Sequence, residues 1–154
     1  MANLRLDVDD ICFYMSKNSR PILLVDDDRT DALLFERALK RLEITNPVVH
    51  SSNGQEAIDY LLDLSNKRPW IVLTDLNTPE MNGLELLRMV KAHEALKRTV
   101  IVVLSGSSDE RDVDECFRLG AAGYITKPTD YTTLLEMIRT IQTYWTLSRI
   151  PPES

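Results

Sequence analysis

Five polar or charged residues follow short apolar runs at four places in this sequence. Asp26 and Asp27 follow the first run, and Asp75, Ser105 and Lys127 each follow a later one. Clustered carboxylates without His or Cys favour a hard cation, which is Mg²⁺ or, as a substitute, Mn²⁺. An ammonium and a hydroxyl beside that cation suit the positioning of a phosphoryl group. This chemistry requires four distant segments to meet.

The apolar runs have the composition of buried parallel strands. They are rich in aliphatic and β-branched residues and lack the polar alternation of a strand with one face in water. The runs cover residues 21–25, 47–50, 70–74, 100–104 and 123–126. We predict a strand at each of them.

The segments between and after these runs carry apolar residues at helical spacing, which predicts five amphipathic helices. Asp28 and Asp130 are predicted N-caps of the first and last helix. Ser107 and Glu110 could form a capping box before the fourth helix. The apolar stripes consist of Ala32, Phe35, Ala38, Leu39 and Leu42; Ala57, Ile58, Leu61 and Leu62; Leu84, Leu87 and Val90; Val113, Cys116 and Phe117; and Leu134, Leu135, Ile138 and Ile141.

Strict alternation of strand and helix predicts an α/β fold with a doubly wound parallel sheet. For (βα)5 the flavodoxin-like strand order 2-1-3-4-5 is the leading prediction. Ligands of such sheets bind at the carboxyl ends of the strands, at the switch point between strands 1 and 3. The five polar residues are therefore predicted to meet at that edge.

Length and composition narrow the function class. The 154 residues suit one domain, and the net charge of -6 argues against binding nucleic acid. No run approaches the ~18 consecutive apolar residues of a membrane span, so we expect a cytoplasmic protein without a membrane partner. Cys12 and Cys116 form no C-x-x-C pair or zinc set, which fits a reducing compartment. We interpret His50 and His93 as surface or incidental residues.

The acids after the first strand allow two interpretations. Asp26, Asp28 and Thr30 match the D-x-D-x-T pattern of haloacid-dehalogenase-type phosphatases, in which Asp26 would be the nucleophile and Asp28 the acid. Those enzymes also need an acidic pair after a further strand beyond Lys127, where this sequence has only "PTD" and one amphipathic segment. We therefore favour the other interpretation, in which Asp26 and Asp27 are metal ligands and the nucleophile is elsewhere.

Four motifs together resemble the receiver domain of two-component response regulators. They are "LLVDD" at 23–27, "LTDLNTPEMNGLELL" at 73–87, "VVLSG" at 102–106 and "GYITKP" at 123–128. The resemblance covers roughly residues 21–142, and four motifs in order are more specific than any one of them. We expect a receiver domain at 21–142, between an N-terminal extension at 1–20 and a C-terminal extension at 143–154.

The resemblance implies that Asp75 accepts a phosphoryl group from a histidine kinase. It also implies that Asp26, Asp27, Asp75 and the backbone carbonyl of Asn77 surround the Mg²⁺ ion. The output would then be a protein contact or a phosphate relay. A receiver-like interaction module that is never phosphorylated is the remaining alternative.

The same resemblance assigns roles to four residues of the last two strands and the loop after them. Ser105 would hydrogen-bond the acyl phosphate, and Lys127 would contact one of its oxygens. Tyr124 would change rotamer together with Ser105 on activation. Pro128 corresponds to the cis proline of the family.

The two ends of the chain support predictions about partners. Residues 8, 11, 12 and 15 are apolar at helical spacing, which is typical of a short helix or docking arm. The tail resembles that of small response regulators that partner bacterial phytochrome histidine kinases. Its apolar residues predict a homodimer, whereas the competing interpretation packs Trp145 on its own domain. These tail residues are Tyr144, Trp145, Leu147 and Ile150.

Overall fold

The computed structural model describes residues 20–149 and shows the predicted flavodoxin-like sheet. All strands are parallel, in the order β2-β1-β3-β4-β5, which confirms the predicted topology. The apolar stripe predicted at residues 8–15 and the predicted contact residue Ile150 lie outside the described range. The strands are β1 (Ile22–Val25), β2 (Val48–Ser51), β3 (Ile71–Asp75), β4 (Ile101–Ser105) and β5 (Gly123–Thr126).

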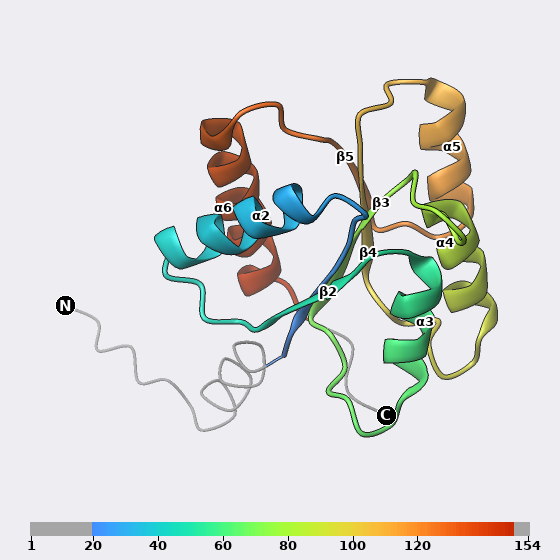
Figure 1. Cartoon of the computed structure of the whole chain (residues 1–154). Helices are drawn as coiled ribbons and strands as arrows, with labels where there is room; N and C mark the ends of the chain where they lie inside the picture. The colour runs from blue at the N-terminus through green and yellow to red at the C-terminus, as the bar shows by residue number, and fades with distance from the viewer. Residues whose placement is uncertain (1–19, 150–154) are drawn as a thin grey trace.

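Helices cover both faces of this sheet (Figure 1). α2 and α6 lie on one face, and α3, α4 and α5 lie on the other. Among the helices of residues 20–149, none combines the length and apolarity that crossing a membrane requires. The helices are α2 (Arg29–Arg41), α3 (Gly54–Leu62), α4 (Gly83–Ala92), α5 (Glu110–Arg118) and α6 (Tyr131–Leu147).

The absence of polar alternation in the strands is explained by two hydrophobic cores. Successive side chains of a strand point to opposite faces of the sheet. In β1, Leu23 and Val25 therefore join the core under α3, α4 and α5, while Ile22 and Leu24 join the core under α2 and α6. Because both faces are covered, every residue of β1 is buried.

Two of the three predicted helix caps are confirmed. The Asp28 carboxylate accepts hydrogen bonds from the amides of Thr30 and Asp31, and Asp130 accepts one from the Thr133 amide. The capping box predicted before α5 was wrong. Asp109 is the N-cap, because the helix begins directly after it at Glu110. The Ser107 hydroxyl instead donates to the Asp112 carboxylate, at 2.7 Å.

Most predicted stripe residues face the sheet, but the prediction was wrong for Leu62, at the end of α3, which is 45% exposed, and for Phe117 on α5. Cys116 is fully buried, whereas Phe117 is 50% exposed. Neighbouring residues of an α-helix are rotated by about 100° around its axis. On α5 this rotation turns Phe117 toward solvent while Cys116 enters the core.

Candidate functional site

The predicted carboxylates meet at the carboxyl edge of the sheet. Asp26 and Asp27 directly follow β1, and Asp75 is the last residue of the neighbouring strand β3. One oxygen of each of the three carboxylates lies within 4.8 Å of the others. Asp26 is buried, Asp75 is partly buried and Asp27 is exposed. The cluster therefore sits at the predicted switch point, and one side of it is open to solvent.

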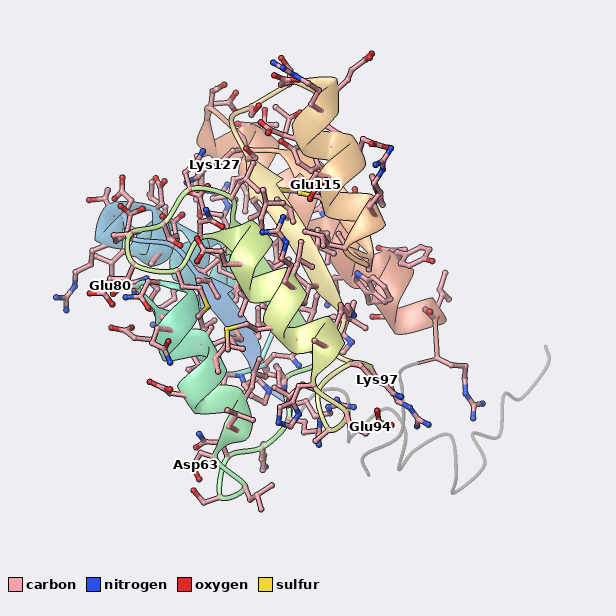
Figure 2. The ribbon with its side chains drawn as sticks, turned by 90° about the vertical axis from the view of Figure 1, so that its right-hand side faces the viewer. Asp63, Glu80, Glu94, Lys97, Glu115 and Lys127 are labelled. Carbon is pink, nitrogen blue, oxygen red and sulfur yellow. The ribbon has the colours of Figure 1, made fainter. Side chains whose placement is uncertain are left out.

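Lys127 reaches this cluster from the other side of β4. Its Nζ lies 2.9 Å from Oδ2 of Asp26 and 3.3 Å from Oδ2 of Asp75. It also lies 3.0 Å from Oδ2 of Asp31, a residue in the first turn of α2 to which the sequence had suggested no role. In Figure 2, Lys127 lies near the loops that follow the strands, at the opposite end of the sheet from Asp63 and Lys97.

Burial and charge set the protonation of this group of side chains. Burial raises the pKa of Asp26 above its ordinary value, and the negative charge of Asp75 adds to this, while the Asp28 amide and Lys127 oppose it. Burial alone would lower the pKa of Lys127, but its contacts with Asp26, Asp31 and Asp75 outweigh that effect and raise the pKa. The Lys127 ammonium therefore stays charged.

The donor set fits a divalent metal ion. Carboxylates this close repel one another unless a cation lies between them, and a single ammonium does not balance Asp26, Asp27, Asp31 and Asp75. All these donors are oxygens, which Mg²⁺ and Mn²⁺ prefer. Asn77 lies beside the cluster, because its backbone amide donates to Oδ1 of Asp75 at 3.3 Å.

Ser105 and Tyr124 hold the same loop from two sides. Ser105, the last residue of β4, is fully buried, and its hydroxyl oxygen accepts a hydrogen bond from the Ser107 amide at 3.0 Å. The Tyr124 hydroxyl donates to the Ser107 carbonyl at 2.8 Å. The sequence predicted roles here for Ser105 and Tyr124, but suggested only a helix cap for Ser107, whose backbone joins them.

Two further contacts position the acids. The His50 Nε2 lies 2.7 Å from the backbone carbonyl of Asp26, so the prediction that His50 is incidental was wrong. Its strand β2 pairs with β1, and this pairing brings the ring to the start of the acidic loop. Gly83 donates from its amide to the Leu76 carbonyl at 2.9 Å. A Cβ on Gly83 would lie 2.7 Å from the Asp75 carbonyl oxygen.

The predicted cis peptide before Pro128 is not observed. All peptide bonds of the described residues are trans, and trans is the intrinsically favoured isomer of a bond before proline. His93 is an exposed residue, as predicted, and its Nδ1 accepts a hydrogen bond from the Ala95 amide.

Comparison with known proteins identifies the family. Residues 22–139 match the response regulator receiver domain. The chain belongs to this family. The receiver is 33% identical over 138 residues to the response regulator Rcp1 of Synechocystis sp., in a match that spans 85% of this chain and 94% of Rcp1.

Solved receiver structures share the fold. The crystal structure of the phosphorylated cyanobacterial phytochrome response regulator RcpA has a TM-score of 0.79 at 33% identity, covering 87% of this chain and 99% of RcpA. The Mn²⁺-bound form of Rcp1 has a TM-score of 0.78 at 31% identity, covering 86% and 99% of the two chains. The metal ion of Rcp1 and the carboxylate cluster described above fit the binding of divalent cations by receivers.

The family match decides between the two interpretations of the acidic loop. Receivers are signalling switches that typically accept a phosphoryl group on an aspartate, and they are not enzymes of the usual kind. The phosphatase alternative needs a further strand after Lys127. Within residues 20–149, only α6 follows β5. We therefore reject the phosphatase interpretation, in which Asp26 and Asp28 would do the chemistry.

Proposed function

We propose that this receiver, at residues 21–142, accepts a phosphoryl group from a histidine kinase on Asp75. One observation carries the choice of Asp75 among the three clustered acids. Asp75 ends β3, which pairs with both β1 and β4. It therefore lies between the acids that follow β1 and the hydroxyl of Ser105 at the end of β4. Asp26 and Asp27 follow a strand that does not pair with β4.

The reaction needs a nucleophile and neutralisation of the incoming charge. An oxygen of Asp75 attacks the phosphorus of a phosphohistidine, so that a P–O bond forms while the P–N bond breaks and the imidazole takes up a proton. Lys127 donates to a phosphoryl oxygen and the Ser105 hydroxyl donates to the product. Asp26, Asp27, Asp75 and the Asn77 carbonyl would hold Mg²⁺, or Mn²⁺ in its place, which supplies charge neutralisation when bound.

Phosphorylation by a small donor tests this proposal. Incubation with acetyl phosphate and Mg²⁺ should add one phosphoryl group by intact-protein mass spectrometry, and a chelator should prevent the addition. Asp75→Asn should remain unmodified. Asp59→Asn removes the same charge from an exposed position on α3 and should react like the wild type. Equal phosphorylation of Asp75→Asn would refute the assignment, and an unmodified wild type would favour an interaction module that is never phosphorylated.

We propose that the partner is a bacterial phytochrome histidine kinase in the cytoplasm. The support is the similarity to RcpA, a phytochrome response regulator, over 87% of this chain. Phosphotransfer from a purified phytochrome kinase should therefore be faster than from a chemotaxis kinase at equal concentrations. The same rate from both kinases would contradict this partner.

We also propose a homodimer through the end of α6. This helix continues to Leu147, and Tyr144 and Leu147 are 62% and 83% exposed. Trp145 is partly buried against the core under α2 and α6, which supports the competing prediction for this one residue. Its ring meets that of Tyr144 edge to face, with the centroids 4.8 Å apart. Tyr144 and Leu147 are therefore the proposed contact residues.

A further inference from the structure

Asp31 on α2 shares the Lys127 ammonium with the proposed phosphorylation site. The Nζ–Oδ2 distance is 3.0 Å for Asp31, compared with 2.9 Å for Asp26 and 3.3 Å for Asp75. The ammonium therefore lies closer to the α2 carboxylate than to the proposed acceptor. This contact links α2 to the loop after β5, on the face of the sheet that α2 and α6 cover.

The three carboxylates use the whole donor capacity of Lys127. An ammonium carries three N–H donors, and Asp26, Asp31 and Asp75 each lie within 3.3 Å of Nζ. In the proposed product the phosphoryl group is bonded to Asp75, so its first contact with Lys127 takes the place of the Asp75 carboxylate, and a second phosphoryl oxygen that binds the ammonium must replace Asp26 or Asp31. The exchange costs least where water can solvate the released carboxylate.

Exposure identifies which of Asp26 and Asp31 is replaced. The Asp26 side chain is 7% exposed and that of Asp75 is 15% exposed, whereas that of Asp31 is 40% exposed. A cavity of about 150 Å³, lined by Asp31, Lys127 and Tyr131, adjoins the contact between α2 and α6. A water molecule takes about 30 Å³ of liquid volume, so the cavity has room to hydrate a released Asp31 carboxylate.

We infer that Asp31 is a positioning residue, which holds Lys127 in the unphosphorylated receiver and releases it when Asp75 is phosphorylated. The inference rests on the proposed function of Asp75. Loss of the Asp31–Lys127 contact is then part of the cost of accepting the phosphoryl group. Phosphorylation would thereby break the ion pair that joins the first turn of α2 to Lys127.

Binding of beryllofluoride, a mimic of the phosphoryl group, measures that cost. Breaking a half-exposed ion pair corresponds to roughly a two- to fivefold change in an equilibrium constant. In the presence of Mg²⁺, Asp31→Asn should therefore bind beryllofluoride roughly two- to fivefold more tightly than the wild type. Mg²⁺ alone should bind the variant no more tightly, because Asp31 is not one of the three clustered carboxylates. A purely structural role of Asp31 would not tighten the binding of beryllofluoride while leaving the binding of Mg²⁺ unchanged.

Two controls complete the experiment. Glu36→Gln removes the same charge from α2 at a residue outside the Lys127 contacts, and should bind beryllofluoride like the wild type. In wild-type protein with ¹³C-labelled aspartate, beryllofluoride should shift the Asp31 carboxyl resonance as the ammonium leaves. This second measurement needs no substitution, so it does not depend on how well a variant folds.

The results separate the two proposals. If wild-type Asp75 binds beryllofluoride while Asp31→Asn shows unchanged or weaker binding, the inference is wrong and the proposed function stands. An unshifted Asp31 resonance, or an equal gain in Glu36→Gln, would overturn it in the same way. If the wild type neither binds beryllofluoride nor accepts a phosphoryl group, both proposals fail.

Discussion

The Tyr124 hydroxyl donates a hydrogen bond to the Ser107 carbonyl oxygen, with 2.8 Å between the two oxygen atoms. Ser107 also donates from its amide to the Ser105 hydroxyl oxygen. The tyrosine ring and the proposed phosphate-binding hydroxyl are therefore coupled through one residue of backbone. A phosphoryl group on Asp75 that attracts the Ser105 hydroxyl would weaken the hydrogen bond between Ser105 and the Ser107 amide. Tyr124, which is bonded to the Ser107 carbonyl, would then be free to move. We therefore expect phosphorylation to bias the surface of α5, β5 and α6 between two states.

The first prediction is that Ser105→Ala uncouples Tyr124 from the site. With Mg²⁺ and beryllofluoride, the wild type should show amide chemical-shift changes at Tyr124 and its neighbours, as measured by NMR. Ser105→Ala should bind Mg²⁺ normally and lose these changes, because no hydroxyl remains to bind the mimic. Ser108→Ala removes an exposed hydroxyl of the same loop and should behave like the wild type. The same shift changes in both variants would refute the coupling.

The second prediction concerns the close approach of Gly83 to the backbone of Asp75. An added Cβ would lie 2.7 Å from the Asp75 carbonyl oxygen and 3.1 Å from the Leu76 Cα, and these backbone atoms cannot move aside as a flexible side chain could. Gly83→Ala should therefore lower the free energy of unfolding in urea by about 1–3 kcal/mol. It should also slow phosphorylation by displacing Asp75.

Gly106→Ala is the matched control for this substitution. A Cβ at Gly106 meets no atom within 4 Å, so the free energy of unfolding should change by less than about 0.5 kcal/mol. Equal stability of the two variants would show that the loop between β3 and α4 tolerates the contact.

The third prediction is that Cys116 resists alkylation in the folded protein. Cys116 is fully buried, and burial, with the charges of Asp112 and Glu115, raises its pKa to about 11. At pH 8 the thiolate fraction is then about two orders of magnitude below that of an unfolded cysteine. Iodoacetamide followed by peptide mapping should show modification of Cys116 only after unfolding in urea. Rapid modification of the folded protein would contradict this burial.

The raised pKa of Cys116 also determines whether this thiol stabilises the fold more at low or at high pH. Because the folded pKa lies above the unfolded one, the contribution of this thiol is fully present below about pH 8.5. It is lost as the pH rises through the folded pKa, about 11. The contribution of Cys116 to the free energy of unfolding in urea should therefore fall as the pH rises from about 8.5 to about 11, and Cys116→Ala should lack this part of the pH dependence.

The fourth prediction separates Tyr144 and Leu147 from Trp145. Tyr144 and Leu147 are exposed on α6, so replacing both with Ser should convert the proposed dimer to a monomer in sedimentation velocity at micromolar concentration. Trp145→Ala should instead lower stability, because its ring packs on its own domain.

Leu64→Ser is the control for this experiment. Leu64 is 94% exposed and follows α3, so this variant loses an equally accessible apolar side chain away from α6. It should remain dimeric. A wild type that stays monomeric with and without beryllofluoride would remove the case for a dimer through α6.

The sequence alone was enough to predict the sheet and the place of the site. Strands buried on both faces need apolar residues at every position, and helices covered on one side need them every third or fourth position. Both signals lie within a few consecutive residues, so they can be read without a structure. The handedness and shortness of the connections then narrow the possible strand orders, among which the flavodoxin-like order was the leading prediction. Asp26, Asp75 and Lys127 meet, and Ser105 lies at the same edge, because each stands at the carboxyl end of a strand of the same parallel sheet or directly after it.

Only the tertiary structure decided which side chains touch. Lys127 and Asp31 are far apart in sequence, and their contact depends on how α2 and the loop after β5 sit on the sheet. The bond of His50 to the backbone of Asp26 requires the pairing of β1 and β2. The burial of Cys116 and exposure of Phe117 depend on the angle at which α5 lies on the sheet. Such contacts arise between elements that are distant in the chain. They depend on the rotation of each helix and the register of each strand, which a local sequence pattern does not determine.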